Sequence, residues 1–493
     1  MTDTVDAPAV APVAVALTRK PSPISALVSA ASAPAGVSKH GPELLALDAG
    51  EQYRFGFSMN ACIGCHSCEV ACAEQNGLPA GTTWRRVGEI EGGAYPDTKR
   101  FHLSMSCNQC LEPACLEGCP TNAYEKLANG VVEHHADDCI GCQYCTWNCP
   151  YSVPAFQPDR RIVTKCDMCQ PRLSEGLAPA CVSACPTHAI TVEKVNVAEW
   201  RADHSAGDAP HLPSVELTLS TTRIELPDNV PLETFSASDW NLRPEHPHWP
   251  LVWLTLVSQF AVGASATASS TASRVLAAAL AVAAMVGALG HLGRPAVAWK
   301  AFRNLRRSWL SREVALLSLY GAVAAAAVPF PVLRIPATVV GVLGVYASAR
   351  LYIVPGRPSW NSPLTVVRFL ATGLALGPLL TGHRSLAAIG VAVALVATAL
   401  NWARLMRSPK HAIPQQARWG AVRLELGWFL PWTACRFALG FVGTVAILGG
   451  APTLVPLAML GIAELIGRWL FYVAVVPLNM PGAFWRGAAG THR

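Results

Sequence analysis

Charged residues are scarce in this chain of 493 residues: Asp, Glu, Lys and Arg make up 14% of it, against about 25% in typical soluble domains. Apolar residues reach 52%, and the long apolar stretches lie almost entirely after Pro250. The net charge of +6 is small, and its basic residues are dispersed over short loops, which argues against a nucleic-acid partner. The composition therefore predicts a soluble N-terminal half and a membrane-embedded C-terminal half.

The N-terminus lacks the pattern of a secretory signal. Asp3 and Asp6 stand where a signal has basic residues, and prolines interrupt the apolar stretch that follows. Arg19 is not part of a twin-arginine pair before an apolar run. We expect residues 1–50 to form a disordered tail rich in Ala and Pro, with a degenerate export signal as the alternative, and residues 483–493 to form a second tail.

Cysteine is nearly absent outside one region, since sixteen of the seventeen cysteines lie between Cys62 and Cys185. They form four groups: Cys62, Cys65, Cys68 and Cys72; Cys107, Cys110, Cys115 and Cys119; Cys139, Cys142, Cys145 and Cys149; and Cys166, Cys169, Cys181 and Cys185. The run C-x2-C-x2-C-x3-C-P is typical of ferredoxins with two clusters, and in such runs the fourth cysteine ligates the other cluster of a pair. A disulfide framework suits a short secreted protein, and zinc sites do not need four cysteines in one run. Sixteen thiolates thus predict four [4Fe–4S] clusters, although spacing alone leaves open which groups pair.

The polar half is predicted to contain two parts. Residues 51–195 should form an α+β ferredoxin-type domain, with strands at the segments GVVEHH and AITVEK. Residues 196–248 should form an extension and linker, in which alternating apolar residues at 215–219 and 224–226 predict a small strand pair.

Residues 249–482 are predicted to form an all-α transmembrane bundle of about eight helices. The apolar segments have the length of roughly 17 to 25 residues that a membrane-spanning helix needs. They lie at about 251–268, 275–292, 313–331, 335–354, 364–382, 385–403, 425–448 and 453–478. Several are rich in Ala and Gly, which permits close helix packing in lipid. A buried soluble bundle would not need so many such segments.

Basic residues are asymmetric between the two sides of the predicted bundle. The loops on the side of the N-terminus carry fourteen Lys and Arg residues at positions from 294 to 423, whereas the opposite loops carry only Arg274, Arg334 and Arg384. Because Lys and Arg favour the cytoplasmic side, we expect a multi-pass protein of the cytoplasmic membrane whose cluster domain faces the cytoplasm. The same basic residues could instead hold a partner subunit or a quinol head group.

The cysteine motifs carry a resemblance to a known family. NACIGCHSCEVACAEQN, CNQCLEPAC, DDCIGCQYCTWNCPY and KCDMC, within residues 53–195, resemble the four-cluster electron-transfer subunit of dimethyl sulfoxide reductase and its molybdoenzyme relatives. The resemblance implies that groups one and four share two clusters and groups two and three share the other two. The implied ligand sets are Cys62, Cys65, Cys68 and Cys185; Cys72, Cys166, Cys169 and Cys181; Cys107, Cys110, Cys115 and Cys149; and Cys119, Cys139, Cys142 and Cys145. It also implies that the pair from groups one and four faces a molybdenum subunit and that the other pair lies nearer the membrane.

The membrane half contains the motif GHLGRP at 290–295, and with ELIGRWLFY at 464–472 it resembles the anchor subunit of dimethyl sulfoxide reductase, in the polysulfide-reductase-like anchor family. By this resemblance His291 belongs to a menaquinol site, where its imidazole would accept a proton. The alternative for His291 is a helix-end side chain that only binds a backbone carbonyl. Arg294 is expected to orient either the quinol head group or the cluster domain. Glu313 is expected to cap the third helix or to move protons.

Three further charged residues lie inside the last two predicted spans, where charge is costly and often functional. Glu464 and Arg468 are four residues apart, which predicts an ion pair on one helix face, and Arg436 lies in the predicted span before theirs. They are either structural or part of a proton path to the quinol site. No His pairs are spaced for haem ligation, which argues against a cytochrome anchor.

The sequence thus predicts an electron-transfer and membrane-anchor subunit for anaerobic respiration, in which the chain itself is not the terminal catalyst. It would oxidise quinol from the membrane pool and pass electrons through four clusters to a separate molybdopterin-containing subunit. Three alternatives remain: electron flow from a dehydrogenase to quinone, a proton-translocating anchor, and a ferredoxin with an inert anchor. The terminal substrate stays open.

Overall fold

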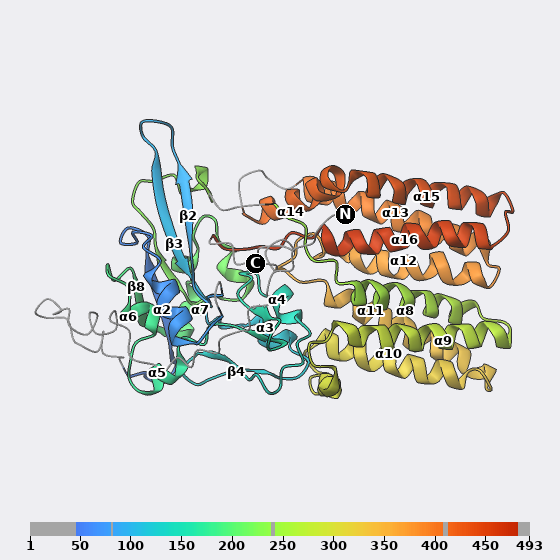
Figure 1. Ribbon diagram of the computed structural model, residues 1–493, viewed down its shortest axis with the longest axis horizontal. Coiled ribbons are helices and arrows are strands. Elements are labelled where there is room, and N and C mark those ends of the chain that lie inside the picture. The colour runs from blue at the N-terminus through green and yellow to red at the C-terminus, as the bar shows by residue number, and fades with distance from the viewer. Residues whose placement is uncertain (1–45, 80–81, 238–241, 408–412, 482–493) are drawn as a thin grey trace, which may run out of the picture. The chain divides into compact units, whose positions relative to one another are not determined.

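The computed structural model describes residues 46–79, 82–237, 242–407 and 413–481 (Figure 1). Its N-terminal part is an α+β domain of short elements between the cysteine loops. The strands are β1 (Glu51–Ser58), β2 (Arg86–Gly92), β3 (Lys99–Met105), β4 (Tyr124–Lys126), β5 (Val132–His134), β6 (Ala155–Gln157), β7 (Ile162–Thr164), β8 (Ile190–Asn196), β9 (Arg223–Glu225) and β10 (Ser236–Ala237). The helices are α2 (Ser67–Gln75), α3 (Ala114–Gly118), α4 (Tyr144–Asn148), α5 (Gln170–Ser174), α6 (Ala180–Ser183) and α7 (Val197–Ala202). The strands predicted at GVVEHH and AITVEK are confirmed as β5 and β8.

Two small sheets frame this domain. The first has the order β8-β1-β9, with β1 antiparallel to β8 and parallel to β9. The second has the order β10-β2-β3, and β2 and β3 form a long hairpin. The buried side chains of β1 and β3, such as Phe55, Phe57 and Leu103, form one apolar core with cysteines of groups one, two and four.

The strand pair predicted at 215–226 is wrong in its first half. Residues Val215–Leu217 form a single 3-10 turn, and Ser214 caps it by accepting a hydrogen bond from the amide of Glu216. Only β9 is extended, and its partner is β1, more than 160 residues earlier in the sequence. The alternating apolar residues correctly predicted that Val215 and Ile224 are buried. They did not predict the backbone conformation, because the pairing of β9 depends on a strand far away in the sequence.

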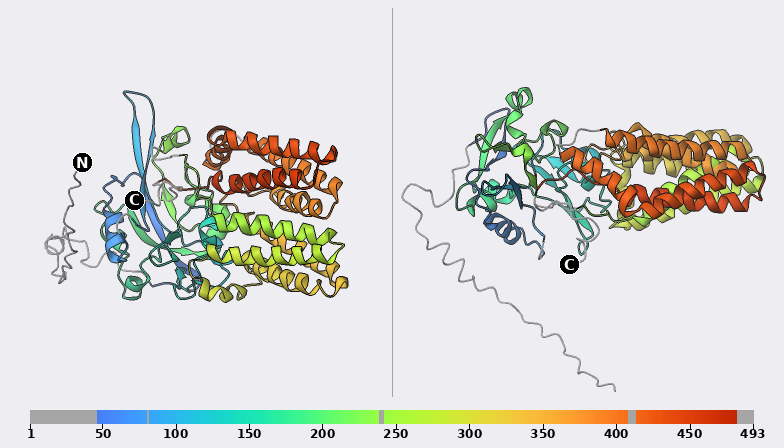
Figure 2. Two further views of the ribbon diagram at one scale, coloured as in Figure 1. Left: turned by 45° about the vertical axis from the view of Figure 1, so that its right-hand side comes forward. Right: turned by 90° about the horizontal axis from the view of Figure 1, so that it is seen from above.

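The C-terminal part is a helical bundle made of four helical hairpins. The long helices are α8 (Trp249–Thr267), α9 (Thr271–Ala288), α10 (Trp309–Ala326), α11 (Arg334–Leu351), α12 (Pro363–Leu380), α13 (Arg384–Met406), α15 (Leu430–Leu448) and α16 (Leu454–Val473). Contacts close α8 to α11 into one group of four and α12, α13, α15 and α16 into a second. The long helices run side by side in both views of Figure 2.

Seven of the helices in the described residues are long and apolar enough to cross a membrane, rather than the eight predicted. The exception is α10, which packs against α9 and α11 like its neighbours but carries Arg312 and Glu313 near its start. The predicted span 425–448 also begins later than expected. A short helix, α14 (Ile413–Arg423), leads into a π-helical turn at Leu424–Trp428, and α15 starts only at Leu430, with Pro431 in its first turn.

The two groups of four helices meet where α8 crosses α12. Gly263 lies so close to α12 that a Cβ atom there would come within 2.0 Å of the carbonyl oxygen of Gly373. A Cβ on Gly377 would lie 2.2 Å from the backbone of Gly263. Small residues that allow backbones to approach this closely are the usual contact between helices in lipid.

Candidate functional site

Groups one and three share the tetrapeptide Cys-Ile-Gly-Cys, and the structure gives both the same turn. Gly64 and Gly141 have φ angles of +68° and +69°, and His66 and Gln143, two residues later, have φ angles of +60° and +61°. A left-handed conformation is inexpensive at glycine, so the backbone can wrap tightly around a central space. A helix begins directly afterwards, α2 in group one and α4 in group three, and its first turn contains the third cysteine of each group.

Four cysteines from two groups line one small cavity. Cys107, Cys110 and Cys115 of group two and Cys149 of group three surround a space of about 20 Å³. Lys165 is also part of the lining. This is the set expected for one cluster, in which the fourth cysteine of one run joins the first three of another.

The pKa shifts of other thiols show which cysteines lie close together, and these pairs also join different groups. Burial and then the charge of Cys119 raise the pKa of Cys142. Burial and then Cys181 raise the pKa of Cys72 to about 11. The structure therefore brings a group-two thiol to group three and a group-four thiol to group one. Burial likewise raises the pKa of Cys62, to which Cys185 contributes.

The donor arrangement fits clusters better than single metal ions or disulfides. All seventeen cysteines are free thiols. In the described part of the chain, no three His, Cys, Asp or Glu side chains converge closely enough to hold one metal ion. A single Zn²⁺ would draw its sulfur ligands to about 2.3 Å from one point, whereas an iron–sulfur cube keeps its four ligands apart around its own atoms.

Two buried cations accompany the thiols, and sequence reasoning missed both. Arg85 is 2% exposed and donates hydrogen bonds to Ser104 and Ser106 on the adjoining strand and loop. Burial alone lowers its pKa, but nearby Cys181 and Cys68 outweigh that effect and raise it. Lys165 is 3% exposed and shows the same balance. Buried cations offset the negative charge of thiolates. One sign of this role is present in the sequence, because Lys165 directly precedes Cys166 in the KCDMC motif.

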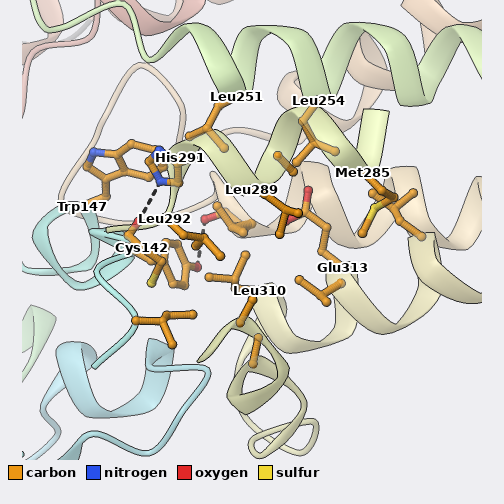
Figure 3. A pocket seen from close by; sticks show the side chains of 18 of the residues that line it. Cys142, Trp147, Leu251, Leu254, Met285, Leu289, His291, Leu292, Leu310 and Glu313 are labelled. Atoms are coloured by element: carbon orange, nitrogen blue, oxygen red, sulfur yellow. Dashed lines mark hydrogen bonds between the residues drawn. The ribbon is translucent and has the colours of Figure 1, made fainter. Parts of the chain in front are cut away.

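A second cavity, of about 110 Å³, lies where the group-three loop meets helices α8 to α11 (Figure 3). Its volume approaches the roughly 150 Å³ of a cavity that binds benzene. Most of the lining is apolar, and its polar side chains include His291 and Glu313. Cys142 and Trp147 form one wall, while Leu254, Met285 and other apolar side chains of the bundle form the others. Two of the six candidate quinol residues thus line one cavity.

The GHLGRP motif clamps the group-three loop through its backbone. The imidazole Nε2 of His291 lies 2.8 Å from the carbonyl oxygen of Cys142. The amide of Arg294 donates to the carbonyl of Ile140 at 3.0 Å, and its guanidinium donates to the carbonyl oxygens of Ala136 and Cys139. Arg294 therefore holds the cluster domain rather than pointing into the cavity, which favours the second of its two expected roles.

Glu313 is the fifth residue of α10 and is buried, with 3% exposure. It does not cap this helix, because the N-cap is Ser308, which accepts a hydrogen bond from the amide of Ser311. One carboxylate oxygen of Glu313 has no hydrogen-bond partner among the described residues. A buried carboxylate with an open oxygen, facing a cavity, is a functional candidate.

Trp147 is the residue at this junction that sequence reasoning passed over. It lies in the motif CTWNCP, between Cys145 and Cys149, and is 3% exposed. Its ring stacks on His291 with a centroid distance of 6.2 Å and meets His248 edge-on at 5.2 Å. An aromatic residue inside a cysteine run was the signal, but its partners come from distant parts of the sequence.

Comparison with known proteins matches both halves. Residues 98–195 match the family model "4Fe-4S dicluster domain", and residues 244–401 match "DMSO reductase anchor subunit (DmsC)". The sequence is 36% identical over 177 residues to the iron–sulfur subunit of the anaerobic dimethyl sulfoxide reductase of Haemophilus influenzae, covering 34% of this chain and 86% of that protein. This protein belongs to the family of these iron–sulfur subunits. It is also 35% identical over 175 residues to the corresponding Escherichia coli subunit, covering 34% of this chain and 85% of that protein. With one subunit of the sulfite dehydrogenase of Allochromatium vinosum it shares 37% identity over 153 residues, or 27% of this chain and 64% of that protein.

The two matches together describe an iron–sulfur subunit fused to a membrane anchor. The protein is a multi-pass electron-transfer subunit with iron–sulfur clusters, in a complex with a catalytic subunit. The anchor match includes the cavity residues His291 and Glu313 but ends before the remaining candidates of the last two helices.

Arg436, Glu464 and Arg468 lie in the second group of helices and are not in the lining of the cavity. The predicted ion pair between Glu464 and Arg468 is not formed. Instead the hydroxyl of Thr372 donates to Glu464 at 2.6 Å, while Arg468 donates to Gln259 at 2.7 Å and makes a longer contact of 3.4 Å to Thr372. Partners from α8 and α12 thus replace the pairing that spacing on one helix predicted.

Proposed function

We propose that this protein oxidises menaquinol at the cavity between the group-three loop and helices α8 to α11. It then passes the electrons through four [4Fe–4S] clusters to a molybdopterin-containing reductase subunit in anaerobic respiration. The observation that carries the proposal is the shared wall of the cavity: Cys142 lines a space that also contains His291 and Glu313. A quinol in this space would lie beside a cluster ligand and beside two proton acceptors.

The ligands proposed for the clusters are the four crosswise sets that the cavity and the neighbouring thiols support. The clusters supply one-electron carriers when they are bound. Arg85 and Lys165 would stabilise thiolate charge from within the domain core, because each is buried and close to several thiols. The set with Cys142 is proposed as the one nearest the membrane.

His291 is proposed to accept a proton from the quinol. A carbonyl oxygen can only accept a hydrogen bond, so Nε2 must carry the hydrogen that faces Cys142. Nδ1 is then the nitrogen with a free lone pair. A quinol releases two protons and two electrons, and Glu313 is a second acceptor in the lining of the same cavity. Leu289, about half exposed at the edge of the lining, offers an apolar approach from the lipid.

The cluster domain is proposed to face the cytoplasm, on the side of the basic loops. Arg436, Glu464 and Arg468 are proposed to stabilise the second group of helices. In the alternative of a proton-translocating anchor, Glu464→Gln would change proton release from vesicles at constant quinol oxidation.

The decisive test is to replace His291 by Gln in the purified complex and to measure the reduction of the clusters by a menaquinol analogue. His383→Gln is the matched control, because His383 lies in the turn between α12 and α13 and is not in the lining of the cavity. We expect a large loss of rate only in the His291 variant, with unchanged chemical reduction of the clusters by dithionite. Equal rates in both variants would support an inert anchor instead.

The direction of electron flow and the partner need separate measurements. Potentiometric titration of the clusters should place them between the quinol pool and a higher-potential acceptor. Potentials below that of the quinone pool would favour the reverse direction. Molybdenum and a pterin in the co-purifying subunit would identify the partner class, and their absence would exclude it.

A further inference from the structure

The segment between α9 and α10 has two faces of different chemistry. We call residues 295–312, from the 3-10 helix Pro295–Phe302 to the first turn of α10, the interfacial segment. Its inner face holds buried Ala301, which lines the cavity, and buried Asn304, which donates to the carbonyl of Cys119 at 2.8 Å. Its outer face exposes Trp299 and Phe302 by 60% and 45%.

The outer face is also strongly basic. Residues 295–312 contain four arginines and one lysine and no acidic residue. Asp138 pairs with both Lys300 and Arg303, and Arg307 lies 3.7 Å from Glu117, so acidic partners do not match the number of cations. Arg306 is exposed.

Two further guanidinium groups flank one aromatic ring without a carboxylate. Arg312 and Arg350 lie 4.4 and 5.1 Å from the ring centre of Trp309. Arg312 donates hydrogen bonds to the carbonyl oxygens of Leu305 and Arg306. Neither arginine forms a salt bridge within the described ranges, and the buried Nε of Arg350 has no hydrogen-bond partner there. Two like charges around one ring repel each other unless an anion lies near them.

The position of the segment indicates which anions are within its reach. It follows a candidate membrane span that ends at His291 and precedes α10, so it lies at the end of the bundle nearest the cluster domain. Exposed Trp and Phe at the end of a span mark the level of lipid headgroups, and anionic headgroups attract clustered arginines.

We propose that the outer face of the interfacial segment binds anionic phospholipid headgroups of the leaflet nearest the cluster domain. The aromatic side chains enter the headgroup layer, and Arg306, Arg307, Arg312 and Arg350 contact phosphate. Because the inner face of the same segment forms part of the cavity wall and holds the loop of Cys119, bound lipid fixes the cavity in place. This last consequence rests on the proposed quinol site, whereas the lipid binding does not.

The test compares two double variants of the full complex. Arg306→Gln with Arg307→Gln removes two exposed cations of the segment, and Lys99→Gln with Arg160→Gln removes two exposed cations of the cluster domain. Each protein is placed in nanodiscs of phosphatidylcholine with increasing phosphatidylglycerol, and retained lipid is counted by native mass spectrometry. We expect the segment variant to need about tenfold more phosphatidylglycerol for equal retention, and the control to match the wild type.

Several results would overturn the proposal. Equal retention in both variants would do so, as would displacement of the lipid by inorganic phosphate alone, which would indicate a free-anion site. Loss of the catalytic subunit from the segment variant, with lipid retention unchanged, would assign the surface to that partner. In a second measurement, quinol oxidation by the wild type should rise with phosphatidylglycerol and that of the segment variant should not. If no variant oxidises quinol, the proposed function fails while lipid retention still decides the inference.

Discussion

Replacing Gly293 by Ala should uncouple the cavity from the cluster domain without unfolding either. A Cβ on Gly293 would lie 2.2 Å from the carbonyl oxygen of Arg161, which is 0.8 Å closer than the 3.0 Å below which real Cβ atoms are essentially never found. The obstacle is backbone, so the loop from His291 to Arg294 must move away by about that distance. The bond from His291 to Cys142, now 2.8 Å, would then open beyond hydrogen-bonding range. A misplacement of about 1 Å can cost up to 100-fold in rate.

The same motif provides the control. A Cβ on Gly290 would meet only Pro250, at 3.5 and 3.7 Å, which is ordinary contact. We therefore expect menaquinol-dependent cluster reduction to fall between tenfold and about 100-fold in Gly293→Ala and to stay near the wild-type rate in Gly290→Ala. Stopped-flow absorbance of the clusters measures the rate, and dithionite reduction checks that the clusters are intact. Equal rates in the two variants would show that the close approach of Gly293 to Arg161 does not position the cavity.

Three other predictions follow from the structure. Cys142→Ser should remove roughly a quarter of the iron and one cluster signal in electron paramagnetic resonance, while Cys435→Ser, in the membrane part, should remove none. Gly377→Val should lower the free energy of unfolding by about 1 to 3 kcal/mol, because the new side chain would overlap Gly263. Gly461→Val is the control, because the space around Gly461 is open. Thermal denaturation of both variants in nanodiscs compares them. Burial and then His291 and His246 lower the pKa of His248 from 6.5 to about 3, so the unfolded state binds more protons in that range. The contribution of neutral His248 to the free energy of unfolding should be fully present above pH 6.5. It should fall toward pH 3 by at most about 1.4 kcal/mol per pH unit, and by less because the ring is only half-buried. His248→Phe should flatten this pH dependence. A melting temperature of the wild type that rises as the pH drops below 6.5 would contradict the assigned sign.

Local sequence patterns correctly predicted the features that are set by residues close together in the chain. The cysteine spacing indicated the loops, and apolar length indicated the long helices, because both features are set within about 25 residues. The features that the sequence did not predict depend on partners that are far apart in the chain. β9 pairs with β1, Glu464 bonds to Thr372, and His291 meets a carbonyl 149 residues earlier, and none of these partners follows from spacing.

Helix α10, the predicted span that is not apolar enough to count as one, shows how functional residues can weaken a sequence pattern. Helix α10 carries Arg312 and Glu313 as its fourth and fifth residues, and they lower its apolar character at the end nearest the cluster domain. The structure gives each a place, Arg312 beside Trp309 on the outer face and Glu313 in the cavity. Polar residues that lower the hydropathy of a membrane helix are therefore candidates for a functional role.

At the GHLGRP motif the two halves of the chain meet backbone to backbone. Gly141 and Gly293 meet without Cβ atoms between them, and the amides of Gly293 and Arg294 donate to carbonyl oxygens of the group-three loop. Contacts of this kind contain no side chain that could rotate away, so the loop cannot shift without moving the helices. A cavity wall that includes Cys142 is then held in register with helices α8 to α11 by the fold itself. Replacing His291 or Glu313 should consequently change proton transfer, whereas changes at these glycines should change the distance between the cavity and the group-three loop.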